Sequence, residues 1–182
     1  MATPMPNVAF NGMSLIFKVR DLVSPPRKTL EEVDLVLGDR VLDYGCGPGA
    51  YVPDAAEMVG ESGKVYALDI HPLAIERVRS IVAKKGLTNV ETIRSDCRTG
   101  LPDGSLDVVL LYDIFHMLDN PQAVLAEMRR VLKPDGLLSF SDHHMPEDDI
   151  VAGVTGDRLF TLVEKGEKTY TFVPRKVRGE AE

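Results

Sequence analysis

One short segment, residues 40–51, constrains the fold more than any other part of the sequence. It reads RVLDYGCGPGAY, so an apolar strand start leads into a loop with glycine at positions 45, 47 and 49. Glycine has no Cβ atom, and glycines at alternate positions let a backbone turn sharply and approach a ligand closely. The next apolar run, residues 64–69, ends in Asp69. A glycine-rich turn between a strand and a helix, followed by an acid about twenty residues later, predicts a βαβ unit that binds a nucleoside.

Asp43 and Pro48 narrow the choice of nucleoside. A dinucleotide site places a pyrophosphate at this loop, where the Asp43 carboxylate would repel it and Pro48 would offer no N–H donor. An ammonium or sulfonium group suits the carboxylate instead. S-adenosylmethionine carries both cations together with an adenosine, so a glycine loop flanked by Asp43 and Asp69 favours S-adenosylmethionine over NAD.

The composition indicates one acidic, soluble domain. With 182 residues the chain can bury a sizeable core but is too short for a second folding unit. A net charge of −7 argues against nucleic acid or an anionic membrane surface as a partner. The start of the chain lacks the pattern of a secretion signal, and no apolar run reaches the ~18 residues that span a bilayer. Cys46 and Cys97 fit small buried side chains in a reducing compartment, so we expect a cytoplasmic protein.

Apolar and amphipathic runs alternate along the chain. Strands are expected at residues 40–44, 64–69, 90–94, 107–112 and 137–141, with a terminal hairpin at 158–164 and 168–173. Helices are expected from Ser24 through Leu37, from the glycine loop to Val59, over residues 72–85, and from Asn120-Pro121 to a break at residues 133–136. This order predicts a Rossmann-like, doubly wound, mostly parallel seven-stranded sheet with an antiparallel edge strand in a single α/β domain. Ligands of such sheets bind beyond the carboxyl ends of the strands.

The loops after these strands resemble those of class I S-adenosylmethionine-dependent methyltransferases, in particular the methyltransferase-11 or ubiquinone-biosynthesis-like group. The matching segments lie within residues 35–142 and read VLDYGCGPG, VYALDIHPLAIERV, SDCRTGLPDGSLDVVLL, IFHMLDNP and EMRRVLKPDGLLSF. The resemblance implies that the chain transfers a methyl group from S-adenosylmethionine to a small-molecule acceptor. It also implies that residues 1–30 form a cap and residues 31–182 the methyltransferase domain.

The resemblance assigns a cofactor contact to each loop. Around the methionine end it places Asp43, Gly45, Cys46, Gly47 and Gly49. It implies that Asp69 accepts from the ribose hydroxyls and that Ile70 packs on the adenine. The adenine amino group would donate to Asp96, with Cys97 beside it, and Tyr112 would lie near the methyl group.

Three histidines are the candidates for a catalytic base, which is needed only if the acceptor carries a proton to lose. His116 follows the fourth strand, and His143 and His144 follow the fifth. Neighbouring side chains on a regular strand point to opposite faces, so one of the last two is expected to reach a single site.

The N-terminal segment admits three roles. Its apolar side chains Met13, Leu15, Ile16 and Phe17 fit a lid over the substrate, a packing helix or a homodimer contact. A lid of this composition favours a small, partly apolar acceptor.

A metal-assisted reaction is a second interpretation of the same loops. Asp113 and Asp142 follow the strands after which catechol-type O-methyltransferases, on the same fold, hold a divalent cation, but Asp113 stands one residue later than its counterpart. Our principal expectation therefore includes no metal. The sequence also leaves open a nicotinamide-dependent oxidoreductase and a non-catalytic member of the fold that binds the nucleoside.

Overall fold

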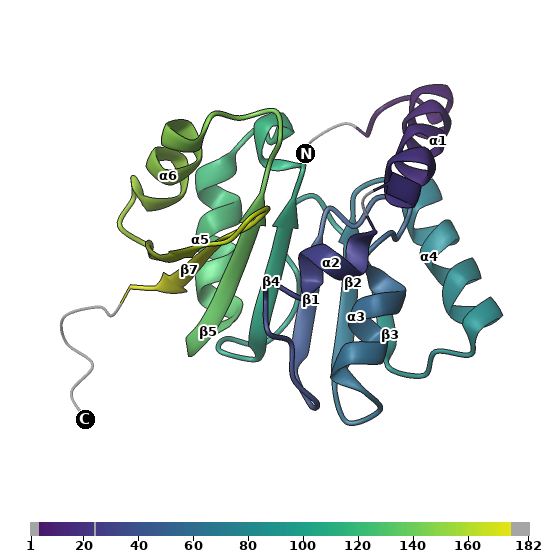
Figure 1. Cartoon of the computed structure of the whole chain (residues 1–182), viewed down its shortest axis with the longest axis horizontal. Coiled ribbons are helices and arrows are strands. Elements are labelled where there is room, and N and C mark those ends of the chain that lie inside the picture. Colours follow the sequence, from purple (N-terminus) through teal and green to yellow (C-terminus); the bar gives the residue numbers. More distant parts are fainter. Residues whose placement is uncertain (1–3, 24, 176–182) are drawn as a thin grey trace.

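Five parallel strands pair side by side and form the centre of the fold (Figure 1). The computed structural model describes residues 4–23 and 25–175, and the strand order is β3-β2-β1-β4-β5-β7-β6. The strands are β1 (Arg40–Tyr44), β2 (Lys64–Asp69), β3 (Val90–Arg94), β4 (Leu106–Tyr112), β5 (Leu132–Ser141), β6 (Phe160–Lys165) and β7 (Tyr170–Pro174). The predicted seven-stranded, mostly parallel sheet is confirmed. Its antiparallel strand is β7, which lies between β5 and the edge strand β6.

Helices cover both faces of this sheet (Figure 1). One face packs against α2 (Pro26–Leu30), α3 (Val52–Val59) and α4 (Pro72–Lys85), and the other against α5 (Pro121–Val131) and α6 (Glu147–Thr155). A short 3₁₀ helix, η1 (Phe115–Met117), follows β4. Side chains alternate across each strand. Val41 therefore packs in the core beneath α2, α3 and α4, and Leu42 packs in the core beneath α5 and α6. No helix in the described part of the chain combines the length and apolar character needed to cross a bilayer.

Capping residues explain where the helices begin and end. Proline occupies a first-turn position in α3, α4 and α5, where its missing N–H costs no hydrogen bond. The side chains of His71 and Asn120 accept from the amides of Leu73 and Ala123, and these bonds start α4 and α5. Gly86 ends α4 with a φ of 66°, as its position after two lysines predicts.

Two predicted boundaries are wrong. The helix expected from Ser24 through Leu37 is described only as Pro26–Leu30; Ser24 lies outside the described residues and Leu37 is 76% exposed. Positive φ angles at Asp34 and Gly38 turn the chain away from a helix. The helix α5 does end before residues 133–136, as predicted, but the next strand starts at Leu132 and not at residue 137. Its pairing with β4 jumps from Leu106↔Leu132 to Val108↔Leu137, so residues 133–136 form a bulge within β5.

The strand order reverses between β1 and β4, which are neighbours although β2 and β3 intervene in sequence. Ligands of doubly wound sheets bind at this switch point. The helix α1 (Asn7–Val23) lies at the same region, beside the start of α4 (Figure 1). Phe10 stacks on His71 with ring centroids 4.3 Å apart, and Arg77 Nη2 donates to Asn11 Oδ1 over 2.6 Å.

We predict that Gly49→Ala lowers the free energy of unfolding by about 3 kcal/mol and Gly86→Ala by about 1 kcal/mol. Both glycines have positive φ angles, which strain an L-residue. A Cβ at position 49 would also lie 2.9 Å from Val78 Cγ2, whereas a Cβ at position 86 meets no atom within 4 Å. Urea unfolding of both variants measures the difference. Equal losses of unfolding free energy in the two variants would show that the glycine loop accommodates the added Cβ without a steric penalty.

Candidate active site

Three adjoining cavities lie at the carboxyl ends of the central strands. The wide cavity, of about 710 Å³, includes Tyr44, Asp96 and Cys97 in its lining. The central cavity is lined by residues that include Asp43 and Tyr112. The wide and central cavities share six lining residues, which are Met5, Gly45, Asp69, Ile70, Ile114 and Met117. The outer cavity, of about 420 Å³, shares Tyr51 and Asp113 with the central one. The wide cavity is of a size that holds a nucleoside.

The glycine loop folds back over the end of β2. The amides of Gly45 and Cys46 both donate to Leu68 O, over 2.8 and 2.9 Å, and the Gly47 amide donates to Asp69 Oδ2 over 2.9 Å. Gly45, Gly47 and Gly49 all have positive φ, as the alternating glycines predict. The loop therefore reaches its shape through its own backbone bonds to β2.

Asp43 is a buried carboxylate beside the central cavity. Its Oδ2 atom has no hydrogen-bond partner among the described residues. Burial, and then repulsion from Asp69, raises the pKa of Asp43 to about 7. A cationic group placed in the central cavity would satisfy this oxygen and favour its charged form.

Asp69 connects the glycine loop to α4. Its Oδ1 accepts from the His71 amide over 2.7 Å, and its Oδ2 accepts from Gly47. Burial raises the pKa of Asp69, against the opposing hydrogen bonds from these two amides. Each carboxylate oxygen has two acceptor positions, so both can take a further hydroxyl donor from the cavity.

Sequence reasoning missed the role of His71. Its Nδ1 accepts from the Leu73 amide, and its Nε2 lies 3.0 Å from Met5 O. Since Nδ1 accepts, Nε2 carries the proton and donates to the Met5 carbonyl. His71 thereby joins the start of α4 to the segment before α1. The proline at position 72 marked a helix start, but no sequence signal linked it to Met5.

The side chains predicted beside adenine line the wide cavity together. Asp96, Cys97 and Ile70 all border it, and the Tyr44 hydroxyl donates to Asp96 O over 3.1 Å. Cys46 is buried as expected, whereas Cys97 is half-buried. Burial raises the pKa of both thiols.

Tyr112 lines the central cavity at the end of β4. Its hydroxyl lies 2.7 Å from Ser139 Oγ, and its ring meets the edge of Tyr51 with centroids 4.9 Å apart. Burial raises the pKa of Tyr112, so its hydroxyl stays neutral.

The three candidate histidines form one cluster beyond β4 and β5. His116 Nδ1 lies 2.8 Å from Asp142 Oδ2, and His143 Nδ1 lies 2.5 Å from Asp113 Oδ1. The ring of His144 is 4.5 Å from that of His116 and 4.0 Å from that of His143. His143 lines the outer cavity, whereas the other two histidines are outside the lining of the three cavities.

Comparison with known proteins identifies the family. Residues 35–178 match the family described as "Methyltransferase domain". The chain belongs to this family.

Relatives and solved structures agree with this assignment. A SAM dependent methyltransferase from Aquifex aeolicus has a TM-score of 0.72, with 31% identity over 86% of this chain and 96% of that chain. Aklanonic acid methyltransferase DauC from Streptomyces sp. (strain C5) is 37% identical over 117 residues, 63% of this chain and 53% of that protein. Demethylmenaquinone methyltransferase from Geobacillus stearothermophilus is 29% identical over 129 residues, 70% of this chain and 55% of that protein. The chain therefore spans about half the length of these curated relatives.

These comparisons confirm the predicted methyltransferase family and its Rossmann-like fold, with S-adenosylmethionine as its methyl donor. The residues of this methyltransferase domain fit that cofactor. The unpartnered Asp43 oxygen suits a cationic end, and Gly47 borders the central cavity with only Gly45 O within 4 Å of its absent Cβ. A side chain at position 47 would fill space that a ligand needs.

The metal-assisted reaction gains no support from the geometry. Asp113 and Asp142 each pair with a different histidine. Burial opposes the charge of Asp142, but hydrogen bonds from His116 and His144 outweigh burial and lower the pKa of this carboxyl. Within residues 4–23 and 25–175, no group of three or more His, Cys, Asp or Glu side chains is arranged to hold a metal ion.

The N-terminal helix covers the cavity in part. Met13, with Met5 and Phe10, lines the central cavity, which fits the predicted lid. Leu15 and Ile16 are 65% and 68% exposed, so these two side chains are not packed against the described residues. The Phe17 side chain lies outside the described residues.

The outer cavity is closed on one side by a carboxylate clasp. Glu32 accepts from the amides of Lys168 and Thr169, each over 3.0 Å, and from the Thr169 hydroxyl over 2.9 Å. These bonds hold the turn between β6 and β7 against the segment after α2. Thr29 of α2 and Gly166 of the turn both line the outer cavity.

We predict that Asp43→Asn stabilises the ligand-free protein, and more at pH 8 than at pH 5.5. The pKa of Asp43 rises to about 7 in the folded chain, so the wild-type protein loses stability as pH increases from about 4 through about 7. The asparagine variant has no such loss, and its advantage in unfolding free energy should grow by about 2 kcal/mol between the two pH values.

Urea titrations at both pH values measure this difference. Asp39→Asn is the control, because the Asp39 carboxylate accepts from Val36 at the opposite end of β1. An Asp43→Asn advantage of equal size at both pH values would contradict the raised pKa.

Proposed function

We propose that this chain transfers the methyl group of S-adenosylmethionine to a small-molecule acceptor in the cytoplasm. The observation that carries the proposal is the buried Oδ2 atom of Asp43, which lies beside a glycine loop and has no hydrogen-bond partner in the described part of the chain. A pyrophosphate would be repelled there, whereas the ammonium and sulfonium of S-adenosylmethionine would pair with the carboxylate.

The neighbouring side chains then fix the orientation of the cofactor. Asp69 accepts from the ribose hydroxyls, Ile70 packs on the adenine, and Asp96 accepts from the adenine amino group. These contacts place the methionine end in the central cavity, between the glycine loop and Tyr112. When bound, the cofactor supplies a methyl group activated by its sulfonium. Positioning of the two reactants contributes most of the rate, because the reaction is an in-line displacement.

His143 is the base in this proposal. Its Nδ1 donates to the Asp113 carboxylate, which leaves Nε2 with the lone pair that accepts a proton. Asp113 lines both the central and the outer cavity, so the His143–Asp113 pair stands where methyl donor and acceptor would meet. His116 and His144 lie farther from this junction and support the loop after β5.

The outer cavity suggests the kind of acceptor. Its lining combines charged groups of both signs, such as Asp142 and Lys165, with apolar side chains such as Ile150. A small molecule with a hydroxyl, amine or acidic C–H group on an apolar skeleton matches this mixture. The two curated relatives are named for aklanonic acid and demethylmenaquinone, which are both small molecules. The net charge of −7 disfavours a nucleic acid substrate.

Two experiments test the function. Calorimetry with S-adenosylhomocysteine and with NAD separates the methyltransferase from the oxidoreductase, and tight NAD binding alone would overturn the proposal. Incubation with labelled S-adenosylmethionine and a metabolite extract then detects the acceptor. Firm nucleoside binding without transfer to any extract component would favour a non-catalytic member of the fold.

We predict that Asp69→Asn weakens binding of S-adenosylhomocysteine by about 1–3 kcal/mol, because the ribose hydroxyls lose a charged acceptor. Asp39→Asn, at the other end of the sheet, should leave the dissociation constant within about twofold. Calorimetry measures both. An unchanged dissociation constant in Asp69→Asn would show that Asp69, at the end of β2, does not contact the ribose.

We predict that His143→Gln lowers methyl transfer to the acceptor from the extract at least ~100-fold, because no group then takes the proton. His144→Gln is the matched comparator and should cost less. Affinity for S-adenosylhomocysteine should not change in either variant. A larger loss in His144→Gln would move the base to that residue.

A further inference from the structure

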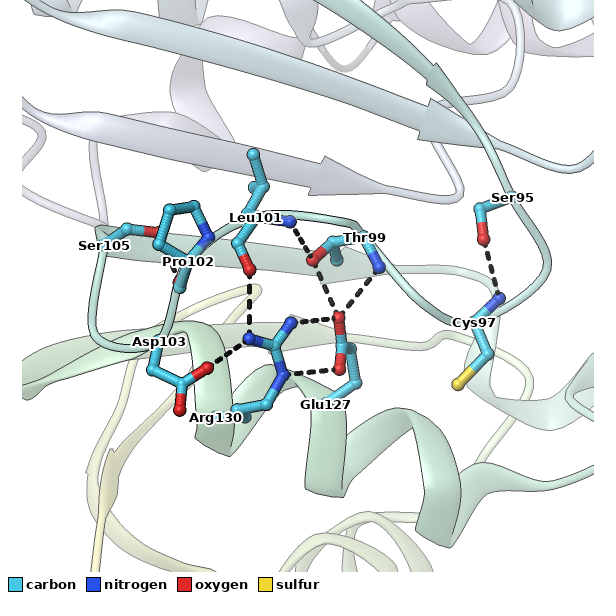
Figure 2. Close-up of polar contacts among 9 residues, drawn as sticks. All are labelled: Ser95, Cys97, Thr99, Leu101, Pro102, Asp103, Ser105, Glu127 and Arg130. Atoms are coloured by element: carbon cyan, nitrogen blue, oxygen red, sulfur yellow. Dashed lines mark hydrogen bonds and ion pairs between the residues drawn. The ribbon is translucent and has the colours of Figure 1, made fainter.

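The connection between β3 and β4 is fastened to α5 by one buried carboxylate. Glu127 accepts from the Thr99 amide over 2.8 Å and from the Thr99 hydroxyl over 2.7 Å (Figure 2). Arg130 donates to the same carboxylate through Nε and Nη2, over 2.9 and 2.7 Å. Figure 2 shows the Arg130 guanidinium reaching on to the Leu101 carbonyl and to Asp103. The middle of this connection, from Thr99 to Asp103, is thus tied to one turn of α5.

This network is fully hydrogen-bonded and costly to disturb. The Glu127 side chain is 9% exposed, and the hydrogen bond from Arg130 leads the contacts that lower its pKa to about 2. The charge is therefore present at any ordinary pH. Removing one partner of a buried, charge-assisted bond costs more than removing a surface pair.

A second anchor comes from the opposite side, out of β1. The Tyr44 ring is buried in the core, and its hydroxyl donates to Asp96 O. Ser95 Oγ accepts from the Cys97 amide over 3.3 Å, so the backbone on both sides of Asp96 is held (Figure 2). The Asp96 side chain is left to border the wide cavity.

We propose that Tyr44 and Glu127 are positioning residues that make the site select a purine with an amino group at carbon 6. This inference rests on the proposed function, in which Asp96 accepts from that amino group. Neither residue needs to touch the nucleobase. Tyr44 holds the Asp96 carbonyl from β1, and Glu127 holds the same connection from α5 at Thr99, three residues later.

The selectivity follows from the fixed position of a charge. A carboxylate held at carbon 6 accepts from an amino group and repels a carbonyl oxygen at the same place. If the loop were loose, Asp96 would turn away from a carbonyl and also hold the amine less firmly. Loss of an anchor should therefore reduce the difference between the two nucleobases, and not only the overall affinity.

The experiment compares S-adenosylhomocysteine with S-inosylhomocysteine by calorimetry on the full chain. Wild-type protein should prefer the adenosyl compound at least ~10-fold. Tyr44→Phe and Glu127→Gln should each lower that preference ~3- to 10-fold, mostly through weaker binding of the adenosyl compound. Asp96→Asn should abolish most of the preference, because an amide can accept from the amino group or donate to the carbonyl.

Matched controls remove the same groups elsewhere. Tyr66→Phe deletes a buried hydroxyl that accepts from Arg40, and Glu32→Gln neutralises the clasp on Lys168 and Thr169. Both controls should keep the wild-type preference.

Each remaining result has a definite meaning. If the anchors lower both affinities in equal proportion, Tyr44 and Glu127 only stabilise the fold, and the inference is wrong. An unchanged preference in Asp96→Asn would also overturn it. If wild-type protein binds neither compound, the proposed function fails first. Tyr44→Phe keeps the buried ring, so it still decides the question if Glu127→Gln does not fold.

Discussion

The two hydrogen bonds that Asp69 accepts hold together the parts on which the rest of the site depends. One comes from the glycine loop and the other from the first residues of α4. His71, at the start of α4, in turn donates to the carbonyl of Met5, which lines the central cavity. Through the Asp69 carboxylate, the glycine loop is thus linked to the start of α4. Burying a charged group at the end of a strand costs desolvation free energy, and the two hydrogen bonds to Asp69 offset part of that cost.

Local signals in the sequence predicted much of this arrangement. The strands at 40–44, 64–69 and 90–94 have the predicted bounds because apolar runs, prolines and glycines mark them directly. The places of Asp43 and Asp69 beside the central cavity were predictable for the same reason, since both lie at the carboxyl ends of these strands. The bond from Tyr44 to Asp96 and the clasp of Glu32 on Thr169 were not. They join residues that are far apart in sequence, and no local pattern encodes such pairs.

Asp43 illustrates how a binding site opposes stability. Its Oδ2 has no hydrogen-bond partner among the described residues, and its raised pKa weakens the ligand-free fold as pH increases from about 4 through about 7. In the proposed function the same carboxylate attracts a cation. Asparagine would fit the same space with less strain on the fold. The proposed ligand therefore accounts for an aspartate that the surrounding core does not require.

The clasp of Glu32 has a consequence for how this fold can diversify. It joins the segment after α2 to the turn between β6 and β7, while Asp69 and its partners lie on the other side of the switch point. The walls that would meet the methyl donor and those that would meet the acceptor are thus braced by different carboxylates. Insertions or exchanges in the hairpin turn can reshape one compartment and leave the other intact. A change in the turn between β6 and β7 can therefore alter which acceptor fits, while the residues proposed to bind the methyl donor stay the same.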